Sequence, residues 1–137
     1  MRYLLLEERK DVPLLLARVF LMVLFVIFGG QKLAGFSGAV GYMSSTGVPA
    51  PAFATVIAIV IEVVAGIAIL VGFYTRPLAL LMALYSLGTG FIGHHYWTMS
   101  GVEHAENMIN FYKNVSITGG LLALCAAGPG RYSFDMK

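Results

Sequence analysis

Residues 52–73, AFATVIAIVIEVVAGIAILVGF, decide the fold, because this apolar run carries one charged side chain, Glu62, near its centre. At about 1.5 Å of rise per residue, a helix of this length spans roughly 30 Å, the thickness of the hydrocarbon core of a bilayer. Its Val, Ile, Leu and Phe residues favour insertion by roughly 4 to 8 kcal/mol, against a cost of about 2.5 to 3.5 kcal/mol for one intramembrane charge. We therefore expect the segment to cross a membrane with Glu62 facing protein or a polar cavity.

The composition of the whole chain also indicates a membrane protein. Of its 137 residues, 58% are hydrophobic and only 12% are charged, with a mean hydropathy of +0.81; soluble domains carry about 25% charged residues. The net charge of +2 is scattered, with no basic run, which argues against nucleic acid as a partner. The single cysteine, Cys125, excludes a disulfide within the chain. The length predicts a single domain over residues 1–137.

Three further apolar segments predict an all-α integral membrane protein with a bundle of four transmembrane helices. Residues 12–30 are longer than a signal-peptide core and lack a small-residue cleavage pattern, so we expect a retained first span. Residues 31–49 are rich in Gly and Ser, which predicts a connecting loop with room for a short interfacial helix. We expect the third and fourth spans over residues 77–95 and 107–127, separated by a polar loop over residues 98–106.

The distribution of Lys and Arg predicts that both termini are cytoplasmic. With four spans and a cytoplasmic N-terminus, the cytoplasmic segments hold six basic residues, whereas the outer side keeps Lys32 and Lys113. The six are Arg2, Arg9, Lys10, Arg76, Arg131 and Lys137. Small residues recur along the second, third and fourth spans, which favours close helix packing and leaves surface for a homo-oligomer.

Several polar side chains within or beside the spans are candidates for ligand binding or proton relay. They are Arg18, Lys32, Glu62, His94, Lys113 and Asn114. Running each helix through the membrane puts Glu62 near mid-depth, Arg18 towards the cytoplasm, and Lys32 and Lys113 towards the outside. One interpretation is a buried ion pair of Glu62 with Arg18 or Lys113 that fixes helix register. The other is a polar cavity that binds an anionic or quinone-like ligand, or relays a proton through Glu62 and His94.

The histidines do not predict a metal site. His94 and His104 are the nearest candidates, but no recognised ligand spacing is present. The adjacent His94 and His95 would point about 100° apart on a helix, so they are poorly placed to share one ion. No motif for a covalent cofactor is present either.

Three stretches of the sequence also show a likeness to known proteins. They are RVFLMVLFVIFGGQKLAGF (18–36), IEVVAGIAILVGFYTRPLALLMALY (61–85) and FYKNVSITGGLLALCAAGPGRYSFD (111–135). With their Gly-x-x-Lys helix end, their Gly72…Thr75-Arg76 turn and their Gly128-Pro129-Gly130 ending, they resemble the DoxX family of small bacterial membrane proteins. The polar positions that match the family are Lys32, Glu62, Arg76, Lys113 and Asn114.

The resemblance implies a multi-pass, four-helix protein of the bacterial inner membrane. Some members of the family are described as subunits of a thiosulfate:quinone oxidoreductase, and others are linked to quinone or hydroquinone stress. By this likeness we expect a redox-associated subunit or quinone-handling protein with a polar site around Glu62 and Lys113, a bound quinone and a soluble redox partner.

Other functions remain open alongside this expectation. The sequence has no haem-ligand pattern, cysteine pair or flavin motif, so electron transfer would need the quinone or the partner, and whether the chain is an enzyme stays open. A membrane anchor for a soluble partner and a transporter of small solutes are the alternatives.

Overall fold

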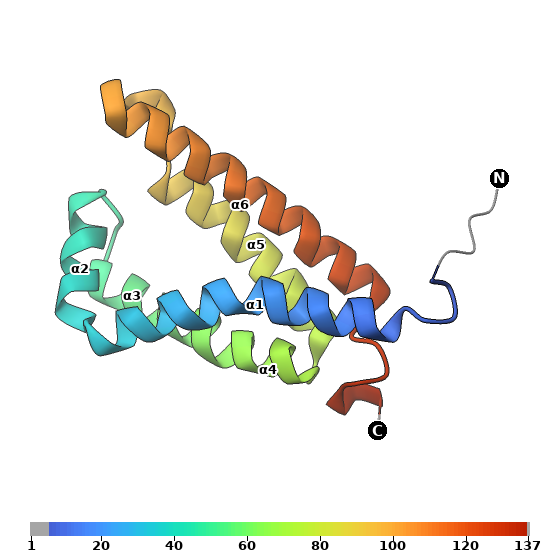
Figure 1. Cartoon of the computed structure of the whole chain (residues 1–137). Coiled ribbons are helices and arrows are strands. Elements are labelled where there is room, and N and C mark those ends of the chain that lie inside the picture. The colour runs from blue at the N-terminus through green and yellow to red at the C-terminus, as the bar shows by residue number, and fades with distance from the viewer. Residues whose placement is uncertain (1–5, 137) are drawn as a thin grey trace.

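The computed structural model describes residues 6–136, and every regular element in that range is helical (Figure 1). The long helices and the connecting ones are α1 (Asp11–Ala34), α2 (Phe36–Ser45), α3 (Pro51–Ile59), α4 (Gly66–Val71), α5 (Thr75–Gly93) and α6 (Gly101–Ala127). A π-helical segment, η1 (Val60–Ala65), joins α3 to α4. Of two 3-10 turns, η2 (Tyr96–Thr98) lies between α5 and α6, and η3 (Phe134–Met136) lies near the C-terminus. The predicted all-α class is confirmed.

The decisive apolar stretch forms one continuous helical unit, α3–η1–α4. Pro51 begins it, where a missing N–H costs nothing and the ring presets φ for a helix. Gly72 ends it with a φ of 77°, in the left-handed region that glycine adopts without a steric penalty. The observed bounds, Pro51–Val71, lie within two residues of the predicted 52–73 at each end.

Three helical segments of the described chain are long and apolar enough to cross a membrane. They are α1, the α3–η1–α4 unit and the stretch Thr75–Thr98, which contains α5. α6 has 27 residues, so its length suffices, but its first half is rich in polar and charged side chains, which weakens its preference for lipid. The fourth crossing and the cytoplasmic position of both termini therefore stay predictions.

The polar loop predicted over residues 98–106 is wrong, because α6 already begins at Gly101. Glu103 lies in the first turn, where a negative charge interacts favourably with the helix dipole. The amide nitrogen of Asn107 also donates a hydrogen bond to the backbone oxygen of Glu103, at 3.0 Å. Hydropathy measures how strongly a segment prefers lipid, not whether it forms a helix. A helix that begins with polar residues therefore has the same low hydropathy as a loop. In the connecting segment, by contrast, the helix α2 lies where the sequence left room for one.

The long helices are arranged as two antiparallel pairs. α1 runs along the α3–η1–α4 unit, α5 runs along α6, and the pairs diverge towards the end where α2 lies (Figure 1). The core joins them where they converge, and it consists of Met22, Phe25, Ala65, Ile69, Ala79, Met82, Ala83, Leu121 and Leu124. Small side chains on α5 allow α6 to approach closely: a Cβ at Gly90 would lie 3.3 Å from Cβ of Asn114.

Arg18 closes the convergent end of the bundle. Its side chain is fully buried and donates hydrogen bonds to the backbone oxygen of Leu70, at 2.8 Å, and to that of Tyr132. The carbonyl group of Leu70 lies in the last turn of α4, where carbonyl groups have no N–H partner within their own helix. Arg18 thus ties α1 both to the end of α4 and to the C-terminal tail.

Asp135 holds the turn between α4 and α5. Its carboxylate accepts hydrogen bonds from the backbone N–H groups of Tyr74, at 2.7 Å, and Thr75, at 2.8 Å, and its own N–H donates to the oxygen of Gly72, at 2.8 Å. Partial burial alone would raise the pKa of Asp135, but these hydrogen bonds and the charge of Arg18 outweigh it and lower the pKa. The carboxylate is therefore ionised at neutral pH and caps the N-terminus of α5.

Replacing Gly72 tests this closed end. In Gly72→Ala the new Cβ would lie 2.2 Å from Cβ of Ser133 and 2.7 Å from Nη1 of Arg18, at a φ that disfavours alanine. We expect a loss of about 1–3 kcal/mol or more, seen as a lower Tm in detergent. Gly88→Ala is the matched control, since nothing lies within 4 Å of its new Cβ. Equal Tm values for the two variants would contradict the closed-end packing.

Candidate functional site

An ion pair lies between the first two long helical units. Nζ of Lys32, near the end of α1, lies 2.8 Å from Oε2 of Glu62 in η1. The hydroxyl of Tyr85, from α5, donates to Oε1 of the same carboxylate at 3.2 Å. Glu62 is only 8% exposed, whereas the Lys32 side chain keeps 26% of its surface open. Both carboxylate oxygens are thus held by donors from two other helices.

Glycine at position 29 makes this pairing attainable. A Cβ at Gly29 would lie 2.7 Å from Cβ of Glu62 and 2.8 Å from Cγ2 of Val63, so α1 touches the second helical unit at this point. Glu62 also lies within the π-helical segment, an extra-wide turn of the kind that occurs often at functional sites. Close contact and local widening together set the carboxylate opposite the Lys32 side chain, one turn further along α1.

The Lys32–Glu62 pair lines an inner chamber of about 490 Å³. Apolar side chains make up most of its wall, among them Leu24, Phe25, Phe28, Ile57, Ile92 and Ile117. Its polar groups come from Lys32, Tyr42, Glu62, Tyr85, Ser86, Thr89, His94 and Asn114. A few converging polar groups in a largely apolar cavity are typical of a small-molecule site.

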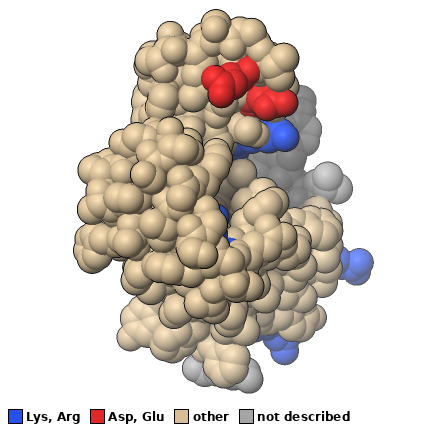
Figure 2. Space-filling model, turned by 90° about the vertical axis from the view of Figure 1, so that its left-hand side faces the viewer, with Lys and Arg blue, Asp and Glu red and all other residues tan. Residues whose placement is uncertain are grey.

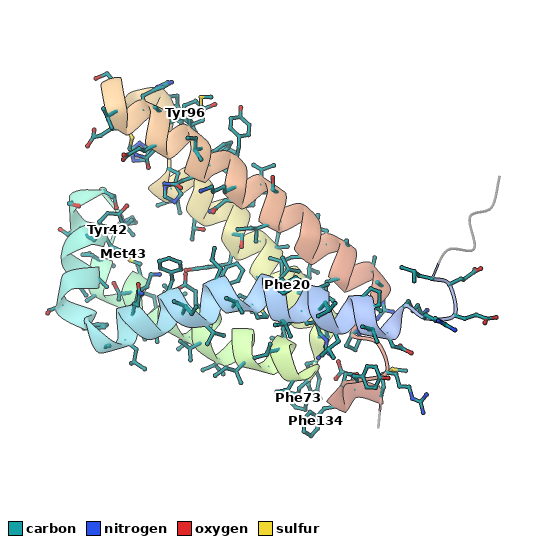
Figure 3. The ribbon with its side chains drawn as sticks, in the orientation of Figure 1. Phe20, Tyr42, Met43, Phe73, Tyr96 and Phe134 are labelled. Atoms are coloured by element: carbon teal, nitrogen blue, oxygen red, sulfur yellow. The ribbon has the colours of Figure 1, made fainter. Side chains whose placement is uncertain are left out.

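A wider outer chamber of about 1270 Å³ adjoins the inner one and shares Lys32, His94 and other lining residues with it. It lies at the end where the helix pairs diverge, between α2 and the first half of α6. In Figure 3, Tyr42 and Met43 of α2, which line this chamber, lie on the side of α2 that faces α5 and α6. Figure 2 shows the molecule hollowed at this end, with basic side chains visible within the hollow.

His94 presents a proton acceptor to the cavity. Its Nδ1 lies 2.9 Å from Oδ1 of Asn107, while Nδ2 of Asn107 donates to the backbone oxygen of Glu103, which identifies the amide orientation. Because an amide oxygen only accepts, Nδ1 of His94 carries the proton and Nε2 is the acceptor in the neutral ring. The ring lines both chambers, so a ligand hydroxyl there can donate to it.

The predicted ion pairing of Glu62 with Arg18 or Lys113 is wrong. Lys32 is the partner, because α1 runs antiparallel to α3–η1–α4 and places Gly29 directly against Glu62. Arg18 is 14 residues earlier, about 21 Å along the helix, and is bound to backbone oxygens at the closed end. Lys113 lines the outer chamber only.

The remaining candidates divide between packing and cavity lining. Asn114 donates to the backbone oxygen of Ser86, at 2.9 Å, and so joins α6 to α5, but it also lines both chambers. Nδ1 of His104 lies 3.0 Å from the backbone oxygen of Tyr96. Among residues 6–136, no three His, Cys, Asp or Glu side chains are grouped to hold a metal ion.

Sequence reasoning missed Tyr85 and Gly29. A tyrosine in the middle of an apolar helix does carry a signal, because a buried hydroxyl usually finds a partner, and the only carboxylate within the predicted spans is Glu62. Gly29 stands out in the sequence only as the glycine of the Gly-x-x-Lys helix end; its contact with Glu62 depends on which helix lies opposite.

The fold and the site define a class: a small multi-pass helical membrane protein with a charged pair in an internal cavity. Residues 13–95, from α1 to the end of α5, match the DoxX family. The chain belongs to this family, and the expected resemblance is confirmed.

Two proteins of Escherichia coli (strain K12) are similar to the chain along nearly its whole length. Inner membrane protein YphA is 50% identical over 137 residues, which is 100% of this chain and 98% of that protein. Inner membrane protein YqjF is 38% identical over 130 residues, 95% of each chain. No solved structure matches the chain significantly. With three helices long and apolar enough to cross a membrane, and with these relatives, the chain is a multi-pass inner-membrane protein.

Adjacent glycines at the site allow a paired test of helix contact. In Gly29→Ala the added methyl group meets Glu62 and Val63, whereas at Gly30 nothing lies within 4 Å of a new Cβ. We expect Gly29→Ala to lose about 1–3 kcal/mol through overpacking and to lower the Tm in detergent. Gly30→Ala should change the Tm little. An unchanged Tm in Gly29→Ala would show that α1 does not touch η1.

A double-mutant cycle tests the ion pair. Lys32→Met leaves a buried carboxylate with one partner fewer, so we expect it to destabilise more than Glu62→Gln, whose freed lysine can extend to the open chamber. The double variant should lose less than the sum, with a coupling of about 1–3 kcal/mol in the free energy of unfolding. Lys10→Met with Glu106→Gln, at opposite ends of the bundle, should be additive. Additivity at Lys32 and Glu62 would contradict a pair in solution.

Proposed function

We propose that this chain binds a quinone or hydroquinone in the inner chamber, as a redox-associated subunit of the inner membrane. The observation that carries the proposal is the Lys32–Glu62 pair with Tyr85 on the wall of a largely apolar cavity. A ring with two polar oxygens needs an apolar wall for its faces and a few donors and acceptors at its edge.

The polar groups of the chamber suit both forms of such a ligand. The ammonium group of Lys32 has three protons, of which Glu62 occupies one, so it can also donate to a quinone oxygen. A hydroquinone hydroxyl can donate to the Glu62 carboxylate or to Nε2 of His94, which also lines the chamber. Proton exchange at these two groups would accompany a redox change of the ligand. We assign the electrons to a soluble redox protein that docks on the chain.

We further propose four crossings, with both termini on the cytoplasmic side. The start of α1 and the end of α6 are joined, because the N–H of Arg131 donates to Oδ1 of Asp11 at 2.8 Å. Arg76 binds the last carbonyls of α6, such as that of Ala126 at 2.7 Å, and brings the start of α5 to the same end. An even number of crossings places the start of α1 and the end of α6 on one side, as these contacts require. α5 packs along α6 and supplies carbonyl partners for Asn114 and Thr118.

Binding of menadione, a neutral naphthoquinone, tests the proposal. We expect saturable binding by native mass spectrometry and by Tm shift, weakened about tenfold in Tyr85→Phe. Tyr85 holds the Glu62 carboxylate that orients the Lys32 donor, and one poorly oriented hydrogen bond from Lys32 to the quinone, about 1.4 kcal/mol, corresponds to that factor. Glu62→Gln should weaken binding of the hydroquinone more than that of the quinone. Tyr132→Phe, an exposed tyrosine at the closed end, is the control.

Two results would contradict the quinone site. One is binding that the Tyr85 and Glu62 variants leave unchanged. The other is a purified protein that neither carries nor binds a quinone; a co-purifying soluble protein would then favour an anchor, and solute flux into proteoliposomes would favour a transporter.

A further inference from the structure

The outer chamber has a charge imbalance that the proposed quinone site does not use. Its lining contains Lys32, Lys113 and His94, but no Asp or Glu. Lys32 is neutralised by Glu62, which lies on the inner side of it. The remaining charge in the chamber is therefore that of Lys113.

Lys113 has no protein counter-charge in the described chain. The structure shows no hydrogen bond or ion pair for its ammonium group, although the side chain lines the chamber. The acidic residues nearest to it along α6 are Glu106 and Glu103, about 10 Å and 15 Å away along the helix axis, and neither lines the chamber. Lys113 is exposed on the wall of the chamber, and a cation beside apolar side chains in a membrane protein is stabilised when an anion accompanies it.

The size and walls of the chamber indicate what could supply that anion. Its volume of about 1270 Å³ exceeds the roughly 300–1,000 Å³ of an ordinary small-molecule pocket. The walls are long apolar side chains, including Leu24, Phe28, Met108, Ile109 and Ile117. Two polar side chains of α6 beside Lys113, those of Asn110 and Tyr112, line the chamber and can hydrogen-bond oxygens of a head group, whereas the Asn114 amide already donates to α5.

We propose that the outer chamber binds a negatively charged amphiphile, with its anionic head at Lys113 and its hydrocarbon chain along the apolar wall. The chemistry required is a carboxylate or phosphate on an alkyl chain, which either a free fatty acid or an anionic phospholipid provides. A lysine ammonium acts as a point charge for such a group. The inference stands apart from the quinone proposal, because menadione is neutral and is assigned to the inner chamber.

Myristate and myristyl alcohol form a matched pair of probes, since they share a chain and differ in the head. In a neutral detergent, titrations followed by Tm should give an apparent Kd at least fivefold lower for myristate. The ratio should fall to about one in Lys113→Met and be restored in Lys113→Arg. Lys10→Met, which removes a basic residue at the closed end, should keep the ratio of the unaltered protein.

Native mass spectrometry from membranes distinguishes the two sources. A phosphatidylglycerol adduct that is lost in Lys113→Met, with phosphatidylcholine not retained, assigns the head group to a phospholipid; a myristate preference without such an adduct assigns it to a fatty acid. Equal binding of acid and alcohol together with no Lys113-dependent phospholipid would overturn the inference. Menadione binding should survive in Lys113→Met, so either proposal can fail while the other stands.

Discussion

The structure depends on one constraint, the placement of a carboxylate in the middle of an apolar helix. Such a charge is stable in a membrane only when donors surround it, and here they come from both sides: Lys32 on α1 and Tyr85 on α5. The contact at Gly29 brings the first of these helices close enough. Three helical units are therefore held in register around Glu62, and the pocket beside it is a direct consequence.

The bundle has one closed and one open end, and the difference follows from where backbone groups are satisfied. At the closed end, Arg18, Arg76 and Asp135 bind the terminal carbonyl and N–H groups of α4, α6 and α5, so the helix ends are tied to one another and to the tail. At the open end the helix pairs diverge and only α2, which buries none of its residues, lies between them. Space for a ligand exists where such ties are missing.

α6 has two roles: it packs against α5 and α1, and it lines the outer chamber. Its buried face, with Thr118 and Leu121, packs on α5 and α1, and Asn114 replaces hydrophobic contact with a hydrogen bond to a carbonyl of α5. Its first half, from Gly101, borders the outer chamber and presents Lys113 to it. A helix of low hydropathy is thus stabilised by a partner helix on one side and carries polar groups to the cavity on the other.

The sequence by itself determined the helical class and the position of the decisive span, because these follow from hydropathy and length. It also determined that Glu62 needs polar partners, because an unpaired charge inside a membrane is costly. It did not identify the cation that pairs with Glu62: the sequence favoured Arg18 or Lys113, whereas the antiparallel register of α1 against η1 selects Lys32. The roles of Gly29 and Tyr85 were likewise decided by tertiary structure. Contacts between helices depend on rotation and register, which a periodic apolar pattern leaves open, since many faces of such helices are equally apolar.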